Sequence, residues 1–304
     1  MDNQILARTP CETRTPRRAL LSGAQLLSGA GIESSKLDVQ VLLCHVLAVE
    51  KSDLYLRLDE ALTAQQEARF QLLLQRRARR EPVAYITESK EFWSLDFTVD
   101  RNVLIPRPET ELLVELALEY AKTNAANRSL KILDLGTGSG AIAVSLAKEL
   151  PAAQVWAVDI SADALPIAQN NAERHGVSSQ ITFLHGDLFA PLENSAVQFD
   201  LIVANPPYIK SALLPLLPPE IRNCEPRVAL DGGIDGLDYY RRILGGASRY
   251  LLGAGAILLE LGADQGDAVK HLLSRTAVFA PASIYRDLAG KDRVIAAAKG
   301  NVRG

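Results

Sequence analysis

The chain has 304 residues, of which 48% are apolar and 23% charged, with a formal net charge of −3 and a pI of about 5.9. This balance is typical of globular proteins and argues against a disordered chain, while the acidic pI argues against general attraction to nucleic-acid phosphates. No apolar run approaches the roughly 20 residues of a membrane-spanning helix, so we expect a soluble, cytoplasmic protein with two domains.

The N-terminal segment 1–16 has no apolar periodicity and is predicted to be a disordered tail. The three cysteines, Cys11, Cys44 and Cys224, lie far apart and form no CxxC pair. This spacing predicts neither a disulfide framework nor a metal site.

Residues 17–83 are predicted to form a small helical domain. Apolar residues recur there at three- and four-residue spacing, and Thr63 with Gln66 forms the pattern of a capping box. Pro82 is expected to end the last helix. The expected core consists of Leu42, Leu43, Val46, Phe70, Leu73 and Leu74.

Four arginines, Arg76, Arg77, Arg79 and Arg80, follow that core in the sequence. The simplest interpretation is a solvated last helical turn, which suits the negative end of the helix dipole. A contact surface for an acidic or ribosome-associated partner is the alternative.

In residues 84–105 the spacing of apolar residues changes from helical to alternating, and this segment is predicted to form a β-hairpin linker. In the stretch EFWSLDFTV, apolar residues alternate with polar ones from Trp93 to Val99, which is typical of a half-buried strand. We therefore expect one arm of the hairpin to include Trp93, Leu95, Phe97 and Val99.

Residues 106–304 are predicted to form an α/β domain. Buried strands alternate with helices, and this order indicates a mostly parallel sheet covered on both faces. The last two strands, within AVFAPASIYRD and RVIAAA, are expected to form an antiparallel hairpin at the edge of the sheet.

Three strand ends of this domain indicate a nucleoside site. Gly136, Gly138 and Gly140 follow the first strand and would let a ligand approach the backbone. Asp159 ends the second strand, where a carboxylate can accept both ribose hydroxyls, and Asp187 ends the third, near an adenine edge. The glycine spacing also fits a nicotinamide dinucleotide, so this loop leaves the cofactor open.

The fourth strand ends in a stiff corner formed by Asn205, Pro206, Pro207 and Tyr208. If the cofactor is S-adenosylmethionine, the Asn205 amide oxygen and the Pro206 carbonyl would present two acceptors beside the reactive methyl. A planar NH₂ group could donate both hydrogens to them, with Tyr208 covering its face. The corner therefore predicts a clamp for an amide or amine nitrogen.

The order of these motifs resembles the peptide chain release factor glutamine methyltransferases, the PrmC/HemK family. The resemblance covers nearly the whole chain from about residue 20. The motifs that carry it are LIPRPETE (104–111), ILDLGTGSG (132–140), AVDIS (157–161), GDLF (186–189), NPPYI (205–209), EPRVALDGGIDGLDYYRRI (225–243) and ILLELG (257–262).

The resemblance implies methyl transfer from S-adenosylmethionine to the glutamine amide in the GGQ motif of class 1 release factors. It implies a seven-stranded Rossmann-like class I methyltransferase domain, an N-terminal domain that docks the release factor, and a monomer. The residues 209–226 are expected to border the peptide groove. The implied cofactor residues are Asp134, Gly136, Thr137, Gly138, Ser139, Gly140, Asp159, Ile160, Asp187, Leu188 and Asn205; the implied catalytic and substrate residues are Asn205, Pro206, Pro207 and Tyr208, with Arg107 and Glu109 at the substrate.

Three other functions compete with this one. An adenine-N6 methyltransferase acting on DNA or RNA shares the four residues of the corner, although it would be expected to carry a basic groove. A non-catalytic scaffold would have no need for the glycine loop, the ribose acid and the corner together. An oxidoreductase is the fourth hypothesis, based on the glycine spacing alone.

Overall fold

The computed structural model describes residues 15–124 and 129–300, and the chain divides into two compact units, residues 1–87 and 88–304. Most of the predicted tail, residues 1–14, lies outside the described residues. Its last two residues begin the first helix instead, because Thr15 caps that helix and Pro16 occupies its first turn. None of the helices in the described ranges is long and apolar enough to span a bilayer.

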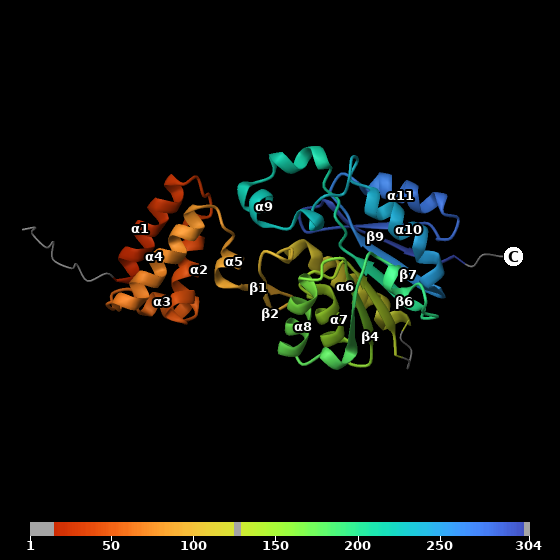
Figure 1. The fold of residues 1–304 in the computed structure, drawn as a ribbon, viewed down its shortest axis with the longest axis horizontal. Helices are drawn as coiled ribbons and strands as arrows, with labels where there is room; N and C mark the ends of the chain where they lie inside the picture. The colour runs from red at the N-terminus through yellow and green to blue at the C-terminus, as the bar shows by residue number, and fades with distance from the viewer. Residues whose placement is uncertain (1–14, 125–128, 301–304) are drawn as a thin grey trace, which may run out of the picture. The chain divides into compact units, whose positions relative to one another are not determined.

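The N-terminal unit is a helical bundle (Figure 1). Thr63 and Gln66 form the predicted capping box, with the side chain of each residue bonded to the backbone of the other. Five of the six predicted core residues are buried, and Val46 packs against them from a half-buried position. The helices are α1 (Pro16–Gly29), α2 (Ser35–Leu47), α3 (Lys51–Leu56), α4 (Ala64–Ala78) and α5 (Val83–Thr87).

The arginine cluster at the end of α4 is not the solvated turn that the sequence predicted. Arg77 is buried and its Nε lies 2.7 Å from an oxygen of Asp38. Arg76 pairs with Glu81 at 2.7 Å, and Arg80 donates to the carbonyl of Gly31. Of the four arginines, only Arg79 has an exposed side chain. Arg76, Arg77 and Arg80 therefore make contacts within the helical bundle, because their partners lie on α2 and on the loops that precede α2 and follow α4.

The linker is a β-hairpin, but the predicted strand through Trp93 is wrong. The strands are β1 (Ser89–Phe92) and β2 (Leu95–Thr98), and Trp93 with Ser94 forms the turn, both at positive φ. The side chain of Asn171 bonds both backbone groups of Thr98, at 2.7 and 3.0 Å. The hairpin is thereby fixed to helix α8 (Ala164–Arg174), and the chain leaving it is directed to the edge of the sheet where the pocket lies.

The second unit contains the predicted seven-stranded sheet, in the order β5-β4-β3-β6-β7-β9-β8. The first five strands are parallel, whereas β9 runs antiparallel between β7 and the edge strand β8. The predicted antiparallel edge hairpin is confirmed. The strands are β3 (Lys131–Leu135), β4 (Gln154–Asp159), β5 (Ile181–His185), β6 (Phe199–Ala204), β7 (Leu251–Glu260), β8 (Ser283–Arg286) and β9 (Asp292–Ala298).

Helices cover both faces of this sheet (Figure 1). On one face lie α6 (Glu111–Asn124), α7 (Ala141–Glu149) and α8, and on the other α10 (Asp238–Tyr250) and α11 (Gly266–Arg275). Central strands such as β6 are therefore buried at every position, and five of its six residues are apolar, as expected for a parallel sheet between two helical layers.

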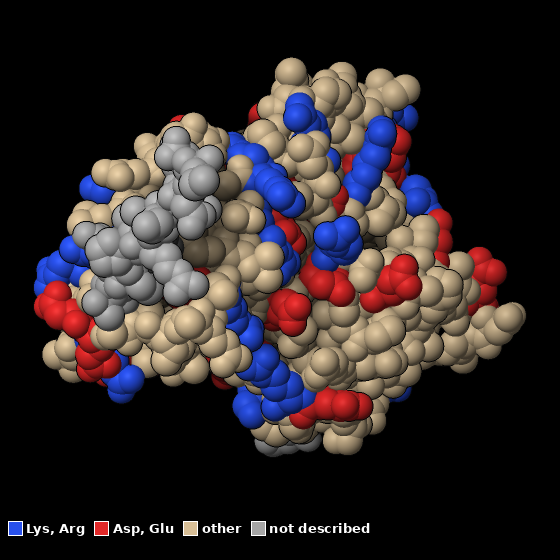
Figure 2. Space-filling view, turned by 60° about the vertical axis from the view of Figure 1, so that its left-hand side comes forward, with Lys and Arg blue, Asp and Glu red and all other residues tan. Residues whose placement is uncertain are grey.

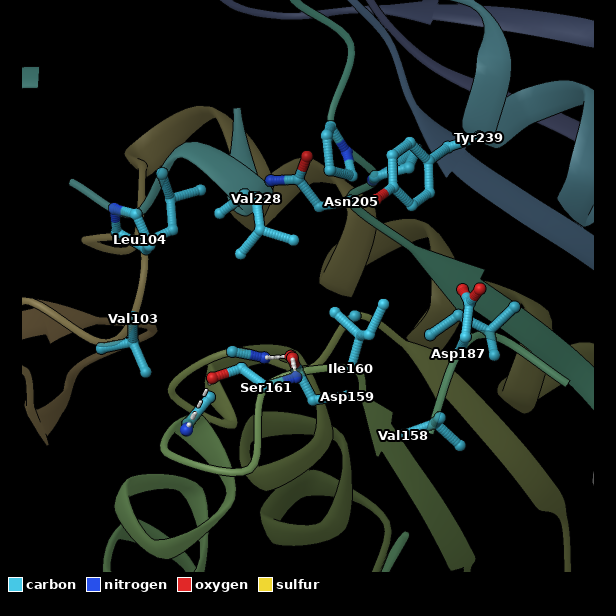
Figure 3. A pocket seen from close by; sticks show the side chains of 18 of the residues that line it. Val103, Leu104, Val158, Asp159, Ile160, Ser161, Asp187, Asn205, Val228 and Tyr239 are labelled. Carbon is cyan, nitrogen blue, oxygen red and sulfur yellow. Dashed lines mark hydrogen bonds between the residues drawn. The ribbon is translucent and has the colours of Figure 1, made fainter. Parts of the chain in front are cut away.

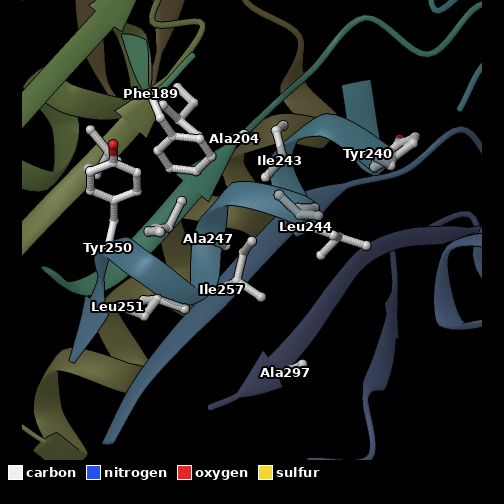
Figure 4. Packing of buried hydrophobic residues seen from close by; sticks show 14 of the residues in the cluster. Phe189, Ala204, Tyr240, Ile243, Leu244, Ala247, Tyr250, Leu251, Ile257 and Ala297 are labelled. Atoms are coloured by element: carbon white, nitrogen blue, oxygen red, sulfur yellow. The ribbon is translucent and has the colours of Figure 1, made fainter. Parts of the chain in front are cut away.

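The α10 face contains a stacked pair of aromatic rings (Figure 4). The rings of Phe189 and Tyr250 stack at a centroid distance of 4.8 Å, and Tyr240, Ile243 and Leu244 from α10 belong to the same buried cluster. This layer packs against the sheet near the paired strands β6 and β7, and the corner that follows β6 lies in the pocket described below.

Candidate active site

A pocket lies at the carboxyl ends of the parallel strands, and its volume is about 710 Å³ when the solvent at its opening is included. Open α/β sheets bind ligands at this edge. In Figure 3, Ile160 and Ser161 face Asn205 and Val228 across the cavity, with Asp187 at one end. The lining residues are Asn102 to Leu104, Leu135, Gly136, Gly138, Val158 to Ser161, Ala164, Gly186 to Leu188, Asn205 to Pro207, Pro226, Val228, Ala229 and Tyr239.

The glycine loop forms part of the pocket wall after β3. Gly136 and Gly138 have φ of +77° and +56°, a conformation that side chains rarely adopt, and a Cβ at either position would meet no protein atom within 4 Å. The backbone is therefore exposed to the cavity. Thr137, Ser139 and Gly140 of the same loop do not line the pocket.

Asp134 supports this loop from below. Its side chain is fully buried, and one carboxyl oxygen accepts a hydrogen bond from Thr137 Oγ1 at 2.7 Å. Burial raises the pKa of Asp134 to about 7. The structure thus places this predicted cofactor residue beneath the loop and outside the pocket lining.

Asp159 lies in the pocket at the end of β4. Its two oxygens accept hydrogen bonds from the backbone N–H groups of Gly138 and Ser161, at 2.7 and 2.8 Å. Burial raises its pKa, and these two donors counteract part of the shift. The carboxylate is therefore held in one orientation, with lone pairs left over for a ligand.

The end of the pocket near β5 combines charge and apolar surface. Asp187 forms an ion pair with Arg242, and the Arg242 guanidinium lies 5.4 Å from the centroid of the Tyr239 ring. Ile160 and Leu188 line the same cavity, and Ile160 is 44% exposed. These groups provide apolar surface on which a flat ring could lie.

The corner after β6 places Asn205, Pro206 and Pro207 in the pocket. Asn205 Nδ2 donates to Thr110 Oγ1 at 3.1 Å, and Thr110 Oγ1 donates to Glu260 Oε2 at 2.6 Å. No described residue donates to Asn205 Oδ1 or to the Pro206 carbonyl. Two acceptors are therefore left at the corner, and their use in a clamp for a substrate nitrogen stays a prediction.

Tyr208 takes a different place from the one expected. It does not line the pocket; its hydroxyl donates to Glu260 Oε1 at 3.3 Å, and its carbonyl accepts from Gln265. A buried phenol needs a hydrogen-bond partner, and Glu260 supplies one. Burial raises the pKa of Tyr208, so the phenol remains protonated.

Arg107 and Glu109 do not line the pocket either. Arg107 forms an ion pair with Glu225, whose side chain is 1% exposed. This pair connects the LIPRPETE segment to the loop of Pro226, Val228 and Ala229, which forms one pocket wall. Glu109 is exposed on the turn η1 (Pro108–Thr110).

Two residues that complete the corner, Thr110 and Glu260, were not among the predicted site residues. Both belong to motifs noted above, LIPRPETE and ILLELG, but their contact joins residues 150 positions apart. Glu260 ends β7, the neighbour of β6, and parallel strands end at one edge of a sheet. That adjacency is the only signal that could have linked them.

A second, open hollow adjoins the pocket and shares Val228 and Tyr239 with it. Its arginines are paired with acids: Arg227 with Asp231, Arg241 with Asp235 and Asp238, and Arg242 with Asp187. On the face drawn in Figure 2, Lys and Arg side chains are likewise interspersed with Asp and Glu.

Comparison with known proteins gives two family matches. The family described as PrmC N-terminal domain matches residues 18–87, and the Methyltransferase small domain matches residues 110–213. A release factor glutamine methyltransferase from Moorella thermoacetica is 45% identical over 279 residues, covering 92% of this chain and 96% of the relative. Its counterpart from Geobacter sulfurreducens is 45% identical over 284 residues, covering 93% and 96%.

Among solved structures, the hMettl16 catalytic domain in complex with MAT2A 3'UTR hairpin 6 has a TM-score of 0.55 and 17% identity. The match covers 74% of this chain and 82% of that one. At this identity the likeness concerns the fold, which is that of a methyltransferase domain.

Proposed function

This chain belongs to the release factor glutamine methyltransferase family, and on that basis we propose a specific reaction. The protein transfers the methyl group of S-adenosylmethionine to the side-chain amide nitrogen of the glutamine in the GGQ motif of class 1 release factors. The products are N5-methylglutamine and S-adenosylhomocysteine. The observation that carries the proposal is the pair of unused acceptors at Asn205 and Pro206, which lie in the same pocket as the glycine loop and Asp159.

The pocket residues fit S-adenosylmethionine. The open space beside Gly136 and Gly138 leaves their backbone accessible to the amino-acid part, and Asp159 retains lone pairs for ribose hydroxyls. Ile160 and Leu188 would contact the adenine. When bound, the cofactor supplies a methyl group on a positively charged sulfur.

Asn205 and Pro206 would bind the substrate glutamine. A primary carboxamide has two N–H donors, and the corner offers two acceptors for them. Binding both hydrogens fixes the nitrogen in one position and stabilises the positive charge that develops on it. Pro207 restricts the rotation of the Pro206 carbonyl, because a residue that precedes proline is confined to an extended ψ, and the Pro206 ring fixes its φ.

Side chains that could remove the amide proton are scarce in this pocket. Among its lining residues, Asp159, Asp187 and Tyr239 can titrate. Asp159 is held by two backbone donors, Asp187 is paired with Arg242, and burial raises the pKa of Tyr239. We therefore attribute catalysis mainly to positioning, with the proton lost to water after nitrogen has gained its methyl group.

The proposal assigns docking of the release factor to the helical unit, with the segment 209–226 at the border of the peptide groove. Both parts carry exposed apolar side chains that a partner could cover. Leu21 and Leu56 are 64% and 84% exposed on the helical unit, and Leu216 is 77% exposed on the segment. A short GGQ peptide should accordingly have a higher KM than the intact release factor.

The adenine-N6 alternative has less support. Nucleic-acid binding relies on cations that can neutralise phosphates. The arginines of the hollow beside the pocket are instead each paired with an aspartate, as described above. They would have to give up these partners before they could contact a phosphate.

The experiment that tests the proposal maps the site of methylation. The full chain is incubated with S-adenosylmethionine and a class 1 release factor, and the digested release factor is analysed by mass spectrometry. We expect a gain of one CH₂ on the GGQ glutamine, and none when that glutamine is replaced by alanine. Methyl transfer to DNA or RNA, with an unmodified release factor, would overturn the proposal.

A further inference from the structure

The Asn205 amide is connected to a buried carboxylate through one hydroxyl. Asn205 Nδ2 lies 3.1 Å from Thr110 Oγ1, which lies 2.6 Å from Glu260 Oε2. Thr110 is 5% exposed and Glu260 is 1% exposed, so water does not readily compete for these bonds. Tyr208 donates to the other carboxylate oxygen.

A proton count fixes the direction of each bond in this chain. An ionised carboxylate can only accept, so Thr110 must donate its single proton to Glu260. The hydroxyl oxygen can then only accept, so it must face the NH₂ group of Asn205. The amide oxygen is thereby left free to accept from a substrate.

Protonated Glu260 would permit the opposite arrangement. A carboxylic acid can donate to Thr110, whose proton is then free to reach the oxygen of Asn205 after a half-turn of that amide. The corner would then present an NH₂ group, which cannot accept a hydrogen bond from a substrate amide. The orientation of Asn205 therefore follows from the protonation of a group that does not line the pocket.

We propose that Glu260 and Thr110 are positioning residues, which select the orientation of the Asn205 amide that can accept the substrate N–H. The proposal rests on the function proposed above and assigns a role to two buried residues outside the pocket lining. Neither residue contacts the reacting atoms; both act through Asn205.

Several charged or titratable groups face Glu260. They are Tyr208 from the corner, Tyr240 from α10, Arg293 from β9 and Glu109 from η1. Burial is the main cause that raises the pKa of Glu260 to about 7, with Thr110, Arg293 and Tyr208 lowering it. The carboxyl is therefore expected to change protonation near neutral pH.

Thr110→Val tests the hydroxyl, because valine keeps the shape of the side chain and removes the bond. We expect kcat to fall about tenfold, the effect of losing one typical hydrogen bond, with cofactor affinity unchanged by calorimetry. Thr110→Ser restores the hydroxyl and should recover most of kcat. Thr123→Val, the same change on the exposed part of α6, is the control and should match the wild type.

Glu260→Gln tests the carboxylate. Its carbonyl can accept from Tyr208, which leaves the NH₂ group to donate to Thr110, as protonated Glu260 would. We expect a kcat that is low at every pH, without the fall below about pH 7 that the wild type should show. The pKa of Asp134 is also about 7, and Asp134 is unchanged in this variant. If Asp134 caused the fall in kcat below about pH 7, the fall would therefore persist in Glu260→Gln.

An NMR titration of the free protein separates this inference from the proposed function. The side-chain NH₂ signals of Asn205 should shift with a midpoint near pH 7 in the wild type and stay constant in Glu260→Gln. This result needs no substrate, so it stands even if no release factor is methylated. Constant signals in the wild type, wild-type kcat in Thr110→Val, or parallel loss of cofactor affinity and kcat in that variant would overturn the inference.

Discussion

The two ends of the pocket rest on the same kind of support, a buried carboxyl group bonded to a threonine hydroxyl. Under the glycine loop the pair is Asp134 and Thr137, at 2.7 Å. Under the corner the pair is Glu260 and Thr110, at 2.6 Å. Burial raises the pKa of both acids to about 7.

The two pairs differ in what they hold. Thr137 belongs to the loop that it stabilises, so its bond shapes backbone against which a cofactor would lie. Thr110 passes its effect to the side chain of another residue, Asn205. The first pair should therefore affect cofactor binding, and the second should affect turnover.

The largest expected effect comes from Asn205→Ala, which removes an acceptor from the substrate end. We expect kcat to fall about a hundredfold to a thousandfold, the usual cost of losing a group that stabilises developing charge. Cofactor affinity, measured by calorimetry, should stay within a few fold of the wild type. Asn170→Ala, at an exposed position of α8 outside the pocket lining, is the matched control. Near-normal turnover in Asn205→Ala would contradict the proposed binding of the substrate nitrogen by Asn205.

Thr137→Val should show the opposite pattern to Thr110→Val. The buried carboxyl of Asp134 loses its one side-chain donor, and the loop above it loosens. We expect the Kd for S-adenosylmethionine to rise about tenfold, with kcat at saturating cofactor unchanged. If Thr137→Val and Thr110→Val both altered kcat, or both altered the Kd for S-adenosylmethionine, the two pairs would not have the separate roles assigned to them.

The pH dependence of stability should be reduced in Asp134→Asn. The folded-state pKa values of Asp134 and Glu260, about 7, lie above their ordinary values of 3.8 and 4.5, so the folded state holds these protons more tightly. Their contribution is complete below about pH 4 and is lost as pH rises to about 7, by up to about 1.4 kcal/mol per pH unit for each group.

Urea unfolding between about pH 4.5 and 7 measures this loss. Asparagine at position 134 does not titrate but can still accept from Thr137. The free energy of unfolding of the variant should therefore fall less steeply with pH than that of the wild type. Parallel curves would mean that Asp134 is ionised in the folded protein throughout this range.

The smallest expected effect is that of Glu109→Ala. Glu109 directly precedes Thr110, but its side chain is exposed and does not line the pocket. We expect kcat and KM within about twofold of the wild type, as for most exposed substitutions. A larger change would show that substrate contacts extend beyond the pocket to this turn.

Features that depend on neighbouring residues could be predicted from the sequence. The glycine loop, the acid at the end of β4, the capping box of Thr63 and the alternation of strands and helices are all of this kind. Each follows from backbone geometry or periodicity within a short window.

Contacts between distant segments could not be predicted in this way. Thr110 with Glu260, Arg107 with Glu225, and Arg77 with Asp38 each pair a side chain with one from another element. The turn at Trp93 was also missed, because alternation continued across it and only the positive φ of two residues marks the reversal. Periodicity indicates which face is buried, but not which polar groups meet there.

The most direct test of the account is a crystal structure with S-adenosylhomocysteine and a GGQ peptide bound. We predict that the glutamine amide nitrogen lies within hydrogen-bond distance of Asn205 Oδ1 and the Pro206 carbonyl, with Thr110 still bonded to Asn205 Nδ2. A glutamine bound elsewhere in the pocket, or an Asn205 that presents its NH₂ group to the peptide, would contradict it.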